Sequence, residues 1–158
     1  MTLADETLAL GVELLRLSGS PSRPRQITLR KAVHCAYYAA FTALCEEWAR
    51  TFQVAARPTA SRMLDHGVVK TACGQIAQGT FKSGAICPRD LVVCARVLPE
   101  LLDARFDADY DSTARFNSSQ VLLLLGQAEF VVRALRAARS ICRPELHLFL
   151  LQCAGAKR

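Results

Sequence analysis

Leu-Arg-Lys-Ala-Val-His-Cys-Ala-Tyr-Tyr-Ala-Ala-Phe, residues 29–41, is the stretch that decides the fold. Apolar side chains recur in it and just beyond it at steps of three and four, the period of a helix face buried in a core. A polar stripe runs beside this apolar seam at steps of four. The seam consists of Val33, Ala36, Tyr37, Ala40 and Leu44, and the polar stripe of Arg30, His34, Tyr38 and Thr42. The stretch therefore predicts a long helix whose buried seam is flanked by a cation, an imidazole, a phenol and a hydroxyl.

Composition places the chain among globular proteins. Hydrophobic residues make up 51% of the 158 residues, far more than a disordered chain carries. No apolar run is long enough to cross a bilayer, so we expect no membrane association. Asp5 and Glu6 stand where a signal peptide carries basic residues, so we expect a cytoplasmic location.

The cysteines and histidines indicate no metal site. The seven cysteines form no Cys-x-x-Cys pair, and no Cys or His cluster has metal-ligand spacing. We therefore expect reduced thiols that fill core space, and neither a metal nor a cofactor.

The rest of the chain is predicted as helices joined by short breaks. Helices are expected over about 2–17, 27–52, 60–77 and 88–102, from Asn117 through Leu135, and over about 144–153. Pro99 is expected to kink or end the fourth helix, residues 105–116 to form an ordered loop, and Asn117 with Gln120 to cap the fifth helix. The apolar positions of the first helix are Leu3, Leu10, Leu14 and Leu17, and those of the third include Met63, Val69, Cys73 and Ile76.

No strand pattern, repeat or low-complexity segment accompanies these helices. The sequence therefore predicts an all-α antiparallel bundle of about five or six helices. We expect one domain over residues 1–153 and a C-terminal tail over residues 154–158.

The net charge of +6 is unevenly distributed. Basic clusters favour polyanions through counterion release, so this distribution is compatible with RNA binding. One basic cluster is Arg23, Arg25, Arg30 and Lys31, a second is Arg133, Arg136, Arg139 and Arg143, and an acidic patch of Asp103, Asp107, Asp109 and Asp111 surrounds Arg105.

Each of the three histidines follows an arginine by four positions. On a helix, residues four apart lie on one face, so each pair would present a guanidinium beside an imidazole. Arginine holds phosphate oxygens bidentately, and histidine can take a proton from a ribose 2′-hydroxyl, so such a pair can cleave RNA without a metal. The pairs are Arg30 with His34, Arg62 with His66, and Arg143 with His147.

Three blocks of the chain resemble the HEPN family, the higher eukaryotes and prokaryotes nucleotide-binding domain. Residues 30–41 resemble its signature helix. Residues 62–67, Arg-Met-Leu-Asp-His-Gly, and residues 105–111, Arg-Phe-Asp-Ala-Asp-Tyr-Asp, are similar to two further blocks that follow in the same order. The resemblance spans about residues 2–139 and implies an up-and-down helical bundle of the HEPN type that forms a homodimer.

The family includes both ribonucleases and inactive binding proteins. Many members are metal-independent ribonucleases of toxin–antitoxin or defence systems, and others bind RNA or partner a nucleotidyltransferase. Active members carry an arginine and a histidine separated by a longer spacer than the three residues between each pair here. In many relatives, an arginine and a histidine occupy the positions of Cys35 and Thr42.

Two functions follow as hypotheses. The first is a dimeric module that binds RNA or a protein partner, such as a nucleotidyltransferase-type antitoxin, using Tyr37, Tyr38, Arg105, Asp109 and Tyr110. The second is a metal-independent endoribonuclease.

The ribonuclease hypothesis assigns catalysis to Arg62 with His66 or to Arg30 with His34, at a cleft between subunits. The same residues also have structural interpretations. His66 can form a cap or pair with an acid such as Asp65, and His34 can be packed in the bundle. Likewise, Tyr37 and Tyr38 can be buried, and Arg105 can hold its loop to the bundle.

Overall fold

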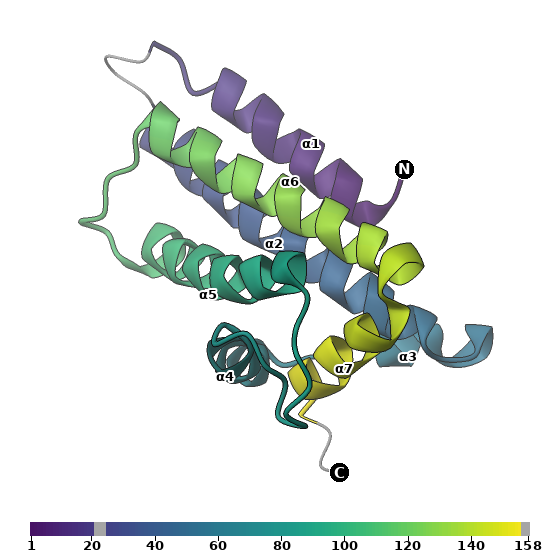
Figure 1. The fold of residues 1–158 in the computed structure, drawn as a ribbon. Coiled ribbons are helices and arrows are strands. Elements are labelled where there is room, and N and C mark those ends of the chain that lie inside the picture. The colour runs from purple at the N-terminus through teal and green to yellow at the C-terminus, as the bar shows by residue number, and fades with distance from the viewer. Residues whose placement is uncertain (21–24, 156–158) are drawn as a thin grey trace.

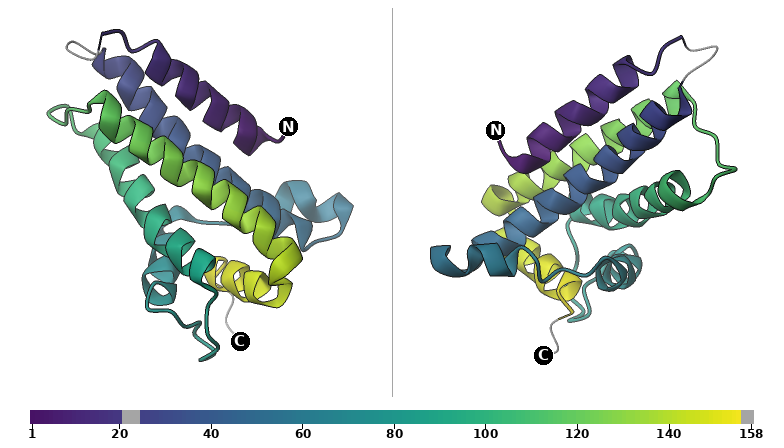
Figure 2. Two further views of the ribbon diagram at one scale, coloured as in Figure 1. Left: turned by 45° about the horizontal axis from the view of Figure 1, so that its top comes forward. Right: turned by 180° about the vertical axis from the view of Figure 1, so that it is seen from behind.

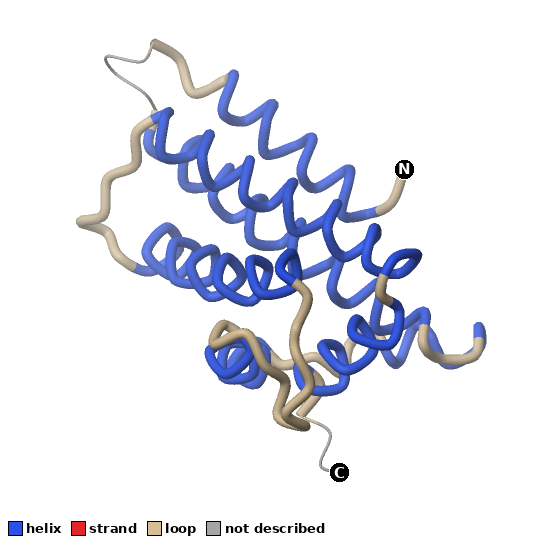
Figure 3. The backbone as a smooth tube through the Cα atoms, in the orientation of Figure 1, coloured by secondary structure: helices blue, strands red, loops and turns tan. Residues whose placement is uncertain are grey.

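The computed structural model describes residues 1–20 and 25–155, which form an all-α bundle (Figure 1). Its helices are α1 (Leu3–Arg16), α2 (Gln26–Arg50), α3 (Arg57–Ala60), α4 (His66–Ile76), α5 (Arg89–Tyr110), α6 (Ser118–Ile141) and α7 (Arg143–Cys153), with a 3-10 turn, η1, over Val54–Ala56. In this part of the chain, the only extended pairing is one isolated bridge between Thr80 and Ile86. Figure 3 shows helices making up the body of the molecule, with loops as their connections.

The central element is α2, against which α1, α5 and α6 all pack. Figures 1 and 2 show α1 and α5 running opposite to α2 and α6, while α4 and α7 lie together at one side of the bundle. The all-α bundle predicted from the sequence is thus observed.

Both stripes predicted for α2 are confirmed. The apolar seam is buried along its length: Val33, Ala36, Tyr37, Ala40 and Leu44 are each 0–2% exposed. The polar stripe lies at the edge of this buried face, since Arg30, His34, Tyr38 and Thr42 are all half-buried. This placement brings four polar groups to the boundary between the core and solvent.

The predicted start of α6 is also confirmed. The Asn117 side chain accepts from the backbone N–H of Gln120, and the Gln120 side chain accepts from the N–H of Asn117. This reciprocal pair satisfies two donors that a helix start leaves free. The expected use of cysteine is confirmed as well, because all seven are free thiols and six of them are buried.

The predicted apolar face of α1 is wrong. Leu3, Leu10 and Leu17 are 63%, 54% and 52% exposed, and Leu14 is half-buried. Instead, α1 turns its small residues Ala4 and Gly11 to the core. Small residues occupy the buried face because α1 packs close to α2. A Cβ added at Gly11 would lie 3.0 Å from the Cβ of Cys35 on α2.

The helix predicted over 60–77 begins later in the structure. The short α3 ends at Ala60, residues 61–65 are not helical, and α4 begins only at His66, with Asp65 as its N-cap. The Asp65 carboxylate accepts from the N–H groups of Gly67 and Val68, at 2.8 and 3.0 Å. This side-chain cap competes with a continuous helix, so Gly67 lies in a first turn rather than in a helix interior. Met63 precedes the helix and is 57% exposed, not part of an apolar face.

The predicted end of the fourth helix, at about residue 102, is wrong because the helix is longer in the structure. Helix α5 continues through Pro99 to Tyr110 and takes in much of the segment expected to be a loop. Proline costs a helix one hydrogen bond, but Leu98, Leu101 and Leu102 around it are buried. Packing on both sides of the proline therefore outweighs the local preference.

We predict that Gly11→Ala destabilises the protein although alanine favours helix. The new methyl group would meet Leu125 Cδ2 at 2.7 Å and the Cys35 Cβ at 3.0 Å, and such overpacking costs about 1–2 kcal/mol. Gly126→Ala on α6 is the matched control, because a Cβ there meets nothing within 4 Å. It should stabilise by about 0.5–1 kcal/mol. Urea unfolding of both variants measures the difference, and equal free energies of unfolding would contradict the close approach of α1.

Candidate functional site

Polar residues from the α2 stripe meet the last turns of α5. We call Arg30, His34, Tyr38, Arg105 and Asp109 the α2–α5 polar cluster. Three of its members come from one face of α2, and Arg105 and Asp109 are four apart on α5 and so share a helix face. The cluster exists because α5 continues past Pro99, which carries Arg105 and Asp109 alongside α2.

Asp109 links the two helices electrostatically. Its Oδ2 lies 2.7 Å from Arg105 Nε on the same helix and 3.2 Å from His34 Nδ1 on α2. The Arg105 contact is an ion pair rather than a hydrogen bond, because the Nε–H makes no hydrogen bond in this geometry. The Asp109 and Arg105 side chains are only 15% and 14% exposed, while the His34 side chain is 34% exposed. Asp109 therefore fixes the Nδ1 edge of an imidazole that solvent still reaches.

Arg105 also lies among aromatic rings. Its guanidinium donates to the Tyr38 hydroxyl at 3.4 Å, and Tyr38 stacks on His34 with ring centroids 4.5 Å apart. The guanidinium carbon is 5.1 Å from the ring centroid of Phe106 and 5.5 Å from that of Tyr110. These distances are within the range of cation–π attraction. Phe106 and Tyr110 are 44% and 71% exposed, so they present an aromatic surface next to a charged group.

The Arg30 guanidinium binds backbone carbonyls at the C-terminal end of α5. It donates to the backbone carbonyls of Ala108, Asp111 and Ala114, at 2.7–2.9 Å. The last carbonyls of a helix lack partners within it, and a cation there also interacts favourably with the helix dipole. Arg30 therefore connects α2 to the end of α5 and is not free beside His34, as the predicted pair requires.

The predicted pair of Arg62 and His66 does not form on one helix. Arg62 precedes α4 and is exposed, whereas His66 is the first residue of α4. The His66 Nδ1 is hydrogen-bonded to the Tyr37 hydroxyl, and its ring centroid is 4.2 Å from that of Phe41. His66 thus belongs to an aromatic cluster between α2 and α4, and its polar partner is a phenol rather than an acid.

Tyr37 is too deeply buried to stack on a base, since it is only 2% exposed. Burial raises the pKa of its hydroxyl, so it remains a hydrogen-bond donor to His66. Burial, together with the charge of Arg105, lowers the pKa of His66. Both groups therefore stay neutral near pH 7, which suits a structural contact.

Four of the five predicted binding residues lie at the α2–α5 polar cluster. Tyr38, Arg105, Asp109 and Tyr110 lie in or beside the polar cluster, and Tyr37 lies below it in the core. Sequence reasoning missed Phe106. Phe106 and Tyr110 are spaced four apart, which is a helical signal, but the segment was expected to be a loop.

Comparisons with known proteins do not identify the chain. No protein-family model, curated protein or solved structure matches it significantly. Among the described residues, no helix is long and apolar enough to cross a membrane. In the same residues, no three His, Cys, Asp or Glu side chains are grouped to hold a metal ion.

We predict that Arg105, not Arg62, acts on the charge of His66. Arg105→Gln removes a positive charge that lowers the His66 pKa, so this pKa should rise towards 6.5 while burial still holds it down. Arg62→Gln is the matched control and should leave it unchanged. NMR titration of the His66 imidazole measures both, and equal shifts in the two variants would contradict the geometry.

The same shift predicts a pH dependence of stability. Folding favours the neutral form of His66, so its contribution is complete above pH 6.5 and declines as pH falls below that value. Arg105→Gln should make this decline smaller.

Proposed function

We propose that this protein is a HEPN-like helical module that binds single-stranded RNA through the exposed end of α5. The observation that carries the proposal is the exposed pair Phe106 and Tyr110, whose ring centroids lie 5.8 Å apart and both lie next to the Arg105 guanidinium. Aromatic rings stack on unpaired bases of any sequence, and arginine adds a cation for the backbone. A homodimer, a role in a toxin–antitoxin or defence system, and a nucleotidyltransferase-type antitoxin partner are further parts of this proposal. They rest on the resemblance of the three sequence blocks.

The acidic patch around this surface is partly neutralised. Asp109 pairs with Arg105 and His34, and Asp103 forms an ion pair with Lys70 of α4. The Asp111 side chain accepts from the backbone and hydroxyl of Thr113. The two ion pairs reduce the repulsion that Asp103 and Asp109 would exert on a nucleic acid backbone, whereas the hydrogen bonds from Thr113 keep Asp111 ionised.

We predict that the double variant Phe106→Ala/Tyr110→Ala weakens RNA binding by about tenfold or more, since each stacked base contributes about 1–3 kcal/mol. Both side chains are exposed, so the fold should tolerate their loss. Ile86→Ala is the matched control, because Ile86 is 81% exposed on a distant loop. Fluorescence anisotropy with a labelled single-stranded oligoribonucleotide at several salt concentrations measures the affinities.

Binding by the wild-type protein should weaken as salt rises, because phosphate contacts release counterions. The absence of RNA binding, or equal affinities of the double variant and Ile86→Ala, would contradict the proposed surface.

A second candidate function is metal-independent RNA cleavage with His34 as the base. The observation in its favour is the contact of Asp109 with His34 Nδ1 at 3.2 Å. A carboxylate on Nδ1 fixes the tautomer that leaves Nε2 free to accept a proton. Arg105, held by the same carboxylate, is placed to attract a phosphate.

If this candidate is correct, His34→Ala abolishes cleavage in EDTA and Asp109→Asn reduces it about a hundredfold or more. Arg62→Ala/His66→Ala should retain cleavage, because neither residue belongs to this cluster. Denaturing gels of a labelled RNA follow the reaction, with circular dichroism to check equal helicity. Loss of cleavage only in the Arg62/His66 variant would instead restore the pair predicted from the sequence.

A further inference from the structure

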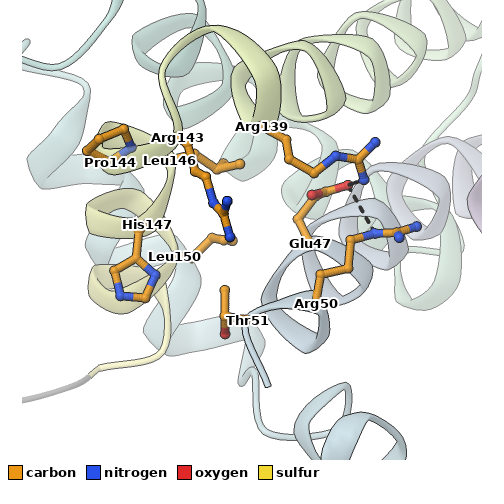
Figure 4. Close-up of a pocket in the computed structure, with 9 residues that line it drawn as sticks. All are labelled: Glu47, Arg50, Thr51, Arg139, Arg143, Pro144, Leu146, His147 and Leu150. Carbon is orange, nitrogen blue, oxygen red and sulfur yellow. Dashed lines mark hydrogen bonds and ion pairs between the residues drawn. The ribbon is translucent and has the colours of Figure 1, made fainter. Parts of the chain in front are cut away.

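A polar cavity lies far from the α2–α5 polar cluster. It opens between the last turns of α2 and α6 and the first turns of α7, and its volume is about 600 Å³ (Figure 4). This volume is typical of pockets that hold small organic ligands. Glu47 is thirteen residues beyond His34 on α2, which places the cavity about 20 Å along the helix from the cluster. The two features are therefore separate.

A buried carboxylate organises one wall of the cavity. The Glu47 side chain is 3% exposed, and its Oε1 accepts from Arg139 Nη1 at 3.1 Å and lies 3.4 Å from Arg50 Nε. Burial raises the Glu47 pKa, while the two guanidinium groups oppose that change. Each guanidinium carries five N–H donors and contacts Glu47 through one nitrogen. Glu47 therefore positions two arginines that keep further donors at the cavity.

Arg143 supplies a third cation. Figure 4 shows its side chain extending into the middle of the cavity, between His147 on one side and Glu47 on the other. Within the described residues, its guanidinium makes no hydrogen bond or ion pair. Arg136 of the same basic cluster differs, because it donates to Asp5 of α1 and to Thr2, the N-cap of α1, both at 2.7 Å. Arg143 is thus a cation of this cluster that lacks such contacts within the described residues and lines the cavity.

The charges and the walls define the ligand. Three guanidinium groups and one carboxylate leave two positive charges, which match a dianion. Leu146 and Leu150 line the same cavity and offer apolar surface to the rest of a ligand. Guanidinium forks bind phosphate oxygens bidentately. We propose that this cavity binds a phosphate monoester that carries an apolar or aromatic group.

This site does not depend on the RNA-binding surface proposed above. A phosphate monoester can be a small free metabolite or the 5′ end of an RNA. Both present the same dianion to Arg143, so the choice between them is made by experiment.

The test is calorimetric titration of the full chain with phenyl phosphate. Arg143→Ala should weaken binding by about tenfold or more, since it removes the cation at the centre of the cavity. Arg133→Ala is the matched control: an exposed arginine of α6 outside this cavity, with the same change in net charge. It should change the affinity by less than about twofold. Arg143 makes no hydrogen bond or ion pair within the described residues, so thermal unfolding of both variants should match wild type.

Further ligands identify what is recognised. Phenol should not bind, and inorganic phosphate should bind more weakly than phenyl phosphate because it lacks the apolar group. A 5′-phosphorylated oligoribonucleotide whose affinity falls in Arg143→Ala, beside a 5′-hydroxyl one whose affinity does not, would identify an RNA end. If only phenyl phosphate depends on Arg143, the ligand is a small metabolite.

The proposal is overturned if phenyl phosphate does not bind, if phenol binds equally well, or if Arg133→Ala weakens binding as much as Arg143→Ala. Phe106→Ala/Tyr110→Ala should leave phenyl phosphate binding unchanged, so failure of one site is distinguishable from failure of the other.

Discussion

The close approach of three helices to α2 is the constraint on which the rest of the structure depends. Small side chains cover the buried surface of α2: Ala32, Ala36, Ala39, Ala40 and Ala43 are each at most 1% exposed. Small residues let helices pack at short distances, and α1 contributes Ala4 and Gly11 to the same approach. The polar stripe of α2 is then left at the edge of this packed surface. There Arg30, His34 and Tyr38 meet α5.

The polar stripe of α2 is thus first a means of attaching α5. Arg30 satisfies the last carbonyls of α5, and Asp109 of α5 is paired with His34. A contact that holds two helices together also holds an imidazole and a guanidinium in fixed positions. Structural and functional uses of one cluster are therefore compatible here. The aromatic end of α5 is free for a ligand because the residues beneath it carry the packing.

The sequence predicted the parts of this arrangement that depend on local pattern. The two stripes of α2 and the cap at Asn117 follow from helical spacing and from side-chain chemistry. The buried face of α1 could not be predicted in this way, because it depends on the close approach of Gly11 to Cys35, which is far away in the sequence. The continuation of α5 through Pro99 is likewise decided by burial of its leucines. Since Arg105 and Asp109 lie beyond Pro99, the sequence predicted these residues as part of a site but not their position beside α2.

The central claim is that the outer end of α5, and not the histidine of α4, meets RNA. The most direct measurement is an NMR titration of isotope-labelled protein with a single-stranded oligoribonucleotide in EDTA. The account predicts that the ring signals of Phe106 and Tyr110 shift first, with His34 beside them, while those of Tyr37 and His66 remain in place. Shifts centred on His66 and Arg62, or none in any aromatic ring, would contradict it.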